Sequence, residues 1–80
     1  MIPSIKDRVT WEQHLVQAEA HVAKGEQTVA RQMRIIAELD RDGHDATAAR
    51  QLLVQFEELL QLHAADRDRL RRELDEPPRG

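Results

Sequence analysis

The residues of this chain that could do chemistry are histidines and carboxylates, and one pair of them is adjacent. In RDGHDATAAR, residues 41–50, His44 is followed directly by Asp45. Metal-dependent phosphohydrolases use such a pair, but they need further histidines and aspartates on other helices, and 80 residues are too few for that scaffold. Gly43 is instead suited to a left-handed helix end, and Asp45 is a good N-cap. The pattern predicts a turn over residues 43–45.

The chain has four histidines, which raises the question of a metal site. His14 and His21 are seven residues apart, so on a helix they share a face but lie about 10 Å from each other, too far to hold one ion together. If two helices pair, His21 could approach His63 or Asp66. A metal- or small-ligand-binding bundle using these three residues is therefore the alternative interpretation. Known bundle sites use Glu and Glu-x-x-His sets that this chain lacks, so we predict neither a metal ion nor a cofactor.

The sequence offers no recognisable catalytic group, and we expect the protein not to be an enzyme. Glu57 and Glu58 are consecutive, so on a helix they diverge by about 100° and cannot flank one bond. Cysteine is absent, and there is no glycine-rich phosphate loop. His63 interrupts an apolar row, which favours a core histidine that hydrogen-bonds to Gln32, to a backbone group or to a second copy.

An apolar row with alternating four- and three-residue steps predicts a first helix over residues 10–42. The row consists of Trp11, Leu15, Ala18, Val22, Gly25, Val29, Gln32, Ile36 and Leu39. Thr10 and Gln13 have the spacing of a capping box at its start, and Ser4 with Asp7 is a weaker, earlier start. Gln32 either tilts outward or selects one register of helix pairing at a cost in stability.

A second row of the same period predicts a helix over residues 46–74. It consists of Ala49, Leu52, Phe56, Leu59, His63, Asp66 and Leu70, flanked by Leu53, Leu60 and Leu74. The sequence EPPRG follows, and its two prolines cannot continue a helix, so residues 75–80 are expected to be a frayed tail.

Two helices joined by so short a turn must be antiparallel, so residues equidistant from the turn face one another. This places Ile36 near Leu52, Val29 near Leu59, and Gly25 near Leu62 or His63. The apolar face of the second helix covers about half of its circumference, whereas one neighbour needs a stripe of only about 100°.

The predicted fold is therefore all-α: residues 1–80 form one antiparallel hairpin, and two hairpins dimerise into a four-helix bundle. Such a dimer would cover the excess apolar surface of each chain. A single chain of this length is too short to bury much of that surface by itself. The expected core and dimer interface comprises Trp11, Leu15, Val22, Val29, Ile36, Leu39, Leu52, Phe56, Leu59, Leu60, His63 and Leu70.

Composition excludes several other partners. Charged residues make up 34% of the chain, the net charge is -3, and basic residues alternate with acidic ones, which argues against nucleic acid. Trp11 and Phe56 are too few aromatic residues to stack bases. No apolar segment approaches the roughly 18 residues of a membrane helix. We expect a cytoplasmic protein with no membrane partner.

Most of the chain, from Trp11 to Leu74, resembles small bacterial proteins, mostly alphaproteobacterial, to which no activity is assigned. The resemblance is carried by HVAKGEQTVARQ and by IIAELDRDGHDATAARQLLVQFEELLQLHAADRDRL. It implies a small self-contained helical protein and transfers no site residue. The function that the sequence favours is a non-enzymatic, self-associating hairpin that serves as a protein–protein interaction or structural module, with an unidentified protein as a further partner.

Overall fold

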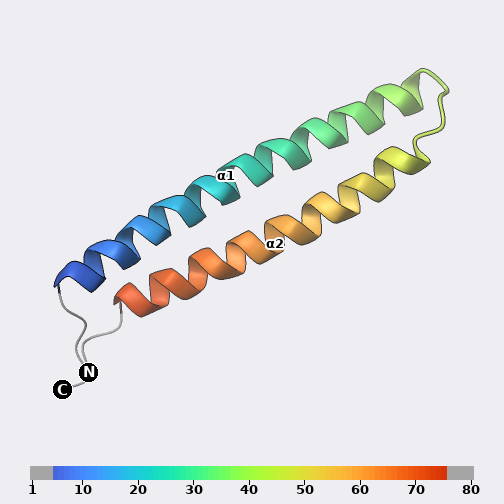
Figure 1. Cartoon of the computed structure of the whole chain (residues 1–80). Helices are drawn as coiled ribbons and strands as arrows, with labels where there is room; N and C mark the ends of the chain where they lie inside the picture. Colours follow the sequence, from blue (N-terminus) through green and yellow to red (C-terminus); the bar gives the residue numbers. More distant parts are fainter. Residues whose placement is uncertain (1–4, 76–80) are drawn as a thin grey trace.

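Two antiparallel helices make up the part of the chain that the computed structural model describes, residues 5–75 (Figure 1). Helix α1 spans Ile5–Arg41 and helix α2 spans Thr47–Asp75. They lie side by side along their length, are joined at one end, and give a rod of 62 × 15 × 14 Å. The structure thus confirms the all-helical hairpin. Of the expected tail at residues 75–80, Asp75 is instead the last residue of α2, and residues 76–80 lie outside the described residues.

Helix α1 begins earlier than the expected residue 10. It starts at Ile5 and runs unbroken through Thr10 and Gln13, so these two residues do not form the predicted helix start. The segment IKDRV contains neither glycine nor proline, and nothing in it interrupts a helix. Asp7 in the first turn favours the positive end of the helix dipole, and an ion pair of 3.2 Å joins Arg8 to Glu12 one turn later.

The turn between the helices is closed by backbone hydrogen bonds around Gly43. The amide of Gly43 donates to the carbonyl of Asp40 at 3.2 Å, and the amide of His44 donates to the carbonyl of Leu39 at 2.9 Å. These two bonds form a Schellman motif, which requires a left-handed residue between them. Gly43 has a φ of 76°, a conformation that costs a side-chain-bearing residue energy. His44 is therefore a connector in this turn.

Asp45 caps the start of α2. Its Oδ1 accepts hydrogen bonds from the backbone amide of Thr47 at 2.9 Å and from the Thr47 hydroxyl at 2.6 Å. The hydroxyl bond, followed by the amide bond, lowers the pKa of the Asp45 carboxyl below its ordinary value of 3.8, and the charge of Arg50 adds to the effect. The first backbone bond of α2 runs from the Arg50 amide to the Ala46 carbonyl. The carboxylate thus satisfies an amide that has no helical partner.

We expect Asp45→Ala to lower the melting temperature at pH 7 and to have less effect in acid. The pKa of Asp45 is lower in the folded chain than in the unfolded one, so the cap stabilises above the unfolded pKa and is lost as pH falls through the folded pKa. Thermal unfolding by circular dichroism at pH 7 and at pH 2.5 measures this. Asp45→Asn keeps an acceptor without a titrating charge and is the matched control. An Ala variant whose deficit is the same at both pH values would contradict the ionised cap.

The row of α1 that faces α2 is the one that the periodicity indicates. Ala18, Val22 and Gln32 are buried. The rest of the row is half-buried: Trp11, Leu15, Gly25, Val29, Ile36 and Leu39.

The row of α2 that faces α1 differs from the expected row at every second position, where the residue one place later in the sequence faces α1 instead. Leu53 and Leu60 are half-buried, whereas Leu52 and Leu59 are 41% and 51% exposed. Leu52 and Leu59 thus lie beside the line of contact and not in it, although Leu59 still lines a pocket with Gly25 and Thr28 of α1. The full row is Ala46, Ala49, Leu53, Phe56, Leu60, His63, Arg67, Leu70 and Leu74.

The charges at the ends of the two competing rows explain this choice. Extending the Leu52 and Leu59 row by seven residues in each direction would bring Asp45 and Asp66 towards α1. Extending the Leu53 and Leu60 row brings Ala46 and Arg67. Burying acidic side chains without partners is costly, whereas an arginine can bury its apolar stem and keep its charge near water. The Arg67 side chain is 23% exposed, and its Nε bonds to Asp68 at 3.0 Å.

Close contact of the helices is centred on Gly25 and Gln32. A Cβ atom at Gly25 would lie 3.0 Å from Cδ1 of Leu60, so the absent side chain is what lets Leu60 approach. The nearest neighbour of Gly25 is thus Leu60 and not Leu62 or His63, although His63 lines the same pocket as Gly25. Gln32, 6% exposed, donates from Nε2 to the carbonyl of Ala49 at 2.8 Å. The glutamine therefore joins the helices and does not tilt outward.

Candidate interaction surface

The line of contact between the helices has two flanks, and on one of them ion pairs join the two helices. Arg50 on α2 reaches Asp40 on α1 at 2.5 Å, and Arg71 reaches Glu19 at 2.9 Å. We call this side the charged flank. Its α1 residues recur every seven positions, as Glu12, Glu19, Glu26, Met33 and Asp40. The exposed Met33 lies in this row, and the exposed Val54 lies between Arg50 and Glu57 of α2.

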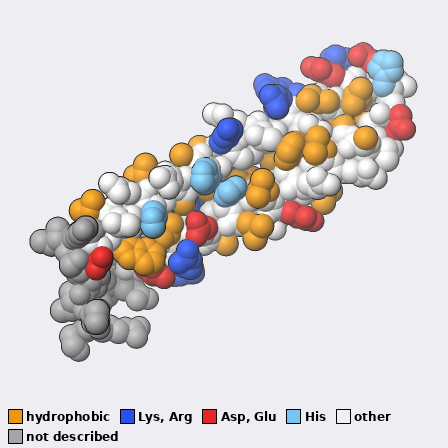
Figure 2. Space-filling model, in the orientation of Figure 1, with side chains coloured by type: hydrophobic (Ala, Val, Ile, Leu, Met, Phe, Trp, Pro, Cys, Tyr) orange, Lys and Arg blue, Asp and Glu red, His pale blue; other side chains and the backbone are white. Residues whose placement is uncertain are grey.

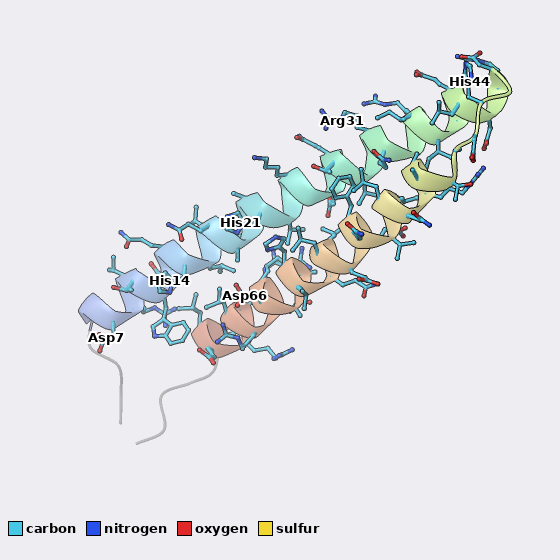
Figure 3. The ribbon with its side chains drawn as sticks, turned by 45° about the vertical axis from the view of Figure 1, so that its right-hand side comes forward. Asp7, His14, His21, Arg31, His44 and Asp66 are labelled. Carbon is cyan, nitrogen blue, oxygen red and sulfur yellow. The ribbon has the colours of Figure 1, made fainter. Side chains whose placement is uncertain are left out.

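The opposite side, which we call the histidine flank, carries a different set of side chains. It comprises His14, His21, Thr28 and Ile35 of α1, and Leu52, Leu59, Leu62 and Asp66 of α2. Figure 2 shows hydrophobic side chains along most of one face of the rod, with histidines among them in the half nearer the chain ends. Figure 3 shows His14 and His21 following one another along α1, with Asp66 across from them on α2.

Large apolar side chains of the histidine flank are open to solvent. Ile35 is 38% exposed, and exposure rises through Leu52 and Leu59 to 68% at Leu62. The cross-helix ion pairs Asp40–Arg50 and Glu19–Arg71 both lie on the charged flank. Exposed apolar strips of this kind are typical of contact surfaces, which makes this flank a candidate.

A shallow pocket of about 210 Å³ opens on the histidine flank. The imidazole rings of His21 and His63 meet at its edge across the two helices, with centroids 5.0 Å apart and planes inclined by 50°. The other lining residues are Lys24, Gly25, Thr28, Phe56, Leu59 and Leu60. His63 therefore contacts His21, and the proposed bond to Gln32 is replaced because Gln32 bonds to the carbonyl of Ala49.

The three residues of the metal hypothesis do not form a metal site. Oδ1 of Asp66 accepts a hydrogen bond from Arg69 at 2.7 Å, and this bond raises the pKa of the Arg69 guanidinium. The carboxylate thus pairs with a cation of its own helix, whereas the His21 ring lies tilted against the His63 ring. Within the described residues no group of three or more histidines, aspartates and glutamates could hold a metal ion. The metal-binding interpretation that used His21, His63 and Asp66 of one hairpin together is therefore wrong.

The residues expected at the core and interface fall into three groups. Val22 and Leu70 are buried between the helices. Leu52 and Leu59 lie on the histidine flank, open to solvent. The others are half-buried: Trp11, Leu15, Val29, Ile36, Leu39, Phe56, Leu60 and His63.

Several contacts were missed by the sequence reasoning although the sequence contains a signal for them. The rows of the charged flank place acidic residues of α1 opposite arginines of α2, as in the Glu19–Arg71 pair. At the open end of the hairpin, Nη1 of Arg8 donates a hydrogen bond to the carbonyl of Leu74 at 3.4 Å. A cation at this position is stabilised by the negative C-terminal end of the α2 dipole. A search for opposite charges flanking the apolar rows would have found the Glu19–Arg71 and Asp40–Arg50 pairs, but not the bond of Arg8 to a backbone carbonyl.

Over residues 5–75, neither helix combines the length and apolar character that crossing a membrane requires. No protein-family model matches the chain, and neither the curated proteins nor the solved structures gave a match.

Proposed function

We propose that the protein is a non-enzymatic interaction module whose hairpins self-associate in pairs to form a four-helix bundle. The observation that carries the proposal is the excess of exposed surface. The chain exposes 6418 Å², whereas a compact monomer of its mass, 9.2 kDa, exposes about 4,900 Å². The difference exceeds the roughly 800 Å² that each partner buries in a standard protein interface.

The small core of a single hairpin supports the same proposal. Among residues 7–75, the buried apolar side chains are those of Ala18, Val22, Ala46 and Leu70, and no large side chain is completely buried. So small a core gives a chain of this length little stability, and such chains commonly gain the remainder by oligomerisation. A second hairpin supplies a further apolar layer without any other molecule.

Sedimentation equilibrium combined with circular dichroism tests the proposal. We expect a mass of twice 9.2 kDa at micromolar concentration, and helicity that falls together with mass on dilution. The joint loss follows because the second copy supplies part of the apolar burial that keeps each helix folded. A fully helical chain of 9.2 kDa at micromolar concentration would contradict the proposal.

A further inference from the structure

We propose that the histidine flank is the surface on which the second copy packs, an inference that rests on the proposed self-association. The two flanks of the hairpin offer different surfaces to a partner, and the first difference is electrostatic. Packing on the charged flank would bury the Asp40–Arg50 and Glu19–Arg71 pairs, whose side chains are 44–55% exposed. Removing such pairs from water costs desolvation energy that their attraction does not reliably offset.

The second difference is the kind of apolar side chain: the exposed ones beside the charged flank are Val9, Val16, Met33 and Val54, whereas those of the histidine flank are an isoleucine and leucines. On the histidine flank Leu52 and Leu59 are one heptad apart on α2, Leu62 follows three residues later, and Ile35 stands beside them on α1. This is the spacing with which side chains of one helix enter the gaps of another. The pocket beside Leu59 and Gly25 is a recess in the same surface that can receive an apolar side chain of the second copy.

The dimensions of the flank suit a second copy of the same rod. A face 62 Å long and about 15 Å wide offers on the order of 900 Å², close to the roughly 800 Å² per partner of a standard interface. A two-fold axis brings the same strip of both copies together, so the leucines of each copy contact the apolar strip of the other. Asp66 and Arg69, at the more polar end of the flank, are already paired with each other.

A matched pair of substitutions on α2 distinguishes the flanks. Leu59 on the histidine flank and Val54 beside the charged flank are 51% and 53% exposed, and both lie in the interior of the same helix. Glutamate at either position changes the hairpin itself about equally. We expect Leu59→Glu to raise the dimer dissociation constant at least about 100-fold, since the dimer buries two such carboxylates. We expect Val54→Glu to change it less than about threefold.

Sedimentation equilibrium of the three chains, with circular dichroism of each, gives the result. A weakened Leu59→Glu dimer beside an intact Val54→Glu dimer supports the proposal, whether the dissociated variant is folded or not. If Val54→Glu dissociates as much as or more than Leu59→Glu, or if neither does, the flank is wrongly assigned while self-association stands. A wild-type chain that is a folded monomer overturns both proposals and leaves the flank to a different protein.

Ile35 and Met33 on α1 provide an independent pair, because they lie on the histidine and charged flanks and are 38% and 56% exposed. Ile35→Glu is expected to weaken the dimer and Met33→Glu to leave it intact. The reverse order on α1 would overturn the assignment even if the α2 pair agreed with it.

Discussion

Replacing Leu70 by alanine is expected to lower the free energy of unfolding by about 3 kcal/mol, in the range found for buried leucines. Leu70 is 3% exposed and packs near Trp11 and Ala18 at the open end of the hairpin. Truncation removes apolar contacts and leaves a space that two helices, held at the far end by their turn, fill only in part. For a chain of this size the loss corresponds to a melting temperature at least about 10 °C lower.

Thermal unfolding at one fixed protein concentration measures the effect, since self-association would make the melting temperature depend on concentration. Val16→Ala is the control, because Val16 is also an apolar residue but is 66% exposed. Its free energy of unfolding should change by less than about 0.5 kcal/mol. Equal effects of the two substitutions would mean that the open end of the hairpin is not packed as the structure describes.

Two substitutions of Gln32 are expected to show whether this residue contributes to the stability of the hairpin, to the choice of a single helix register, or to both. Gln32→Ala removes the hydrogen bond to the Ala49 carbonyl and leaves space between the helices, which should cost about 2 kcal/mol. Gln32→Leu also removes the bond but keeps most of the volume. Because the Ala49 carbonyl lies inside a helix and retains its backbone partner, we expect the leucine variant to be at least as stable as the wild type.

The expected defect of Gln32→Leu lies in specificity. A buried polar group with one fixed partner penalises other registers, and an all-apolar row does not. Sedimentation velocity should therefore show several species for the leucine variant where the wild type gives one. A leucine variant that is both destabilised and homogeneous would show that Gln32 acts through stability alone.

Much of the fold could be predicted because local chemistry determines it. Gly43 and Asp45 predict the turn. Gly43 takes the left-handed conformation that the end of α1 needs, and the Asp45 carboxylate accepts a hydrogen bond from the backbone amide of Thr47. The row through Val22 on α1 was also predictable from the sequence, since the other rows along that helix contain charged residues. The start at Ile5 agrees with the weaker alternative, Ser4 with Asp7, which ranked second because the capping pattern at Thr10 outweighed the absence of any helix breaker between Ile5 and Val9.

The α2 row was harder because two rows carry leucines at the same spacing. Leu52 and Leu59 fit the period as well as Leu53 and Leu60 do, and the difference lies in the acidic residues that extend the first row. The candidate site has the same ambiguity. Proximity of His21 to His63 was foreseeable from antiparallel pairing, but the engagement of Asp66 by Arg69 depends on side-chain geometry that spacing alone does not fix.

The turn at Gly43 also bears on how the chain reaches this fold. Its hydrogen bonds join residues three to five positions apart, whereas the contact between Arg8 and Leu74 joins residues 66 positions apart. Once the turn has formed, each successive pair of residues along the helices is brought close by the pair before it, so no step requires distant segments to find one another first. Folding can therefore begin at the turn and proceed towards the chain ends without a slow search.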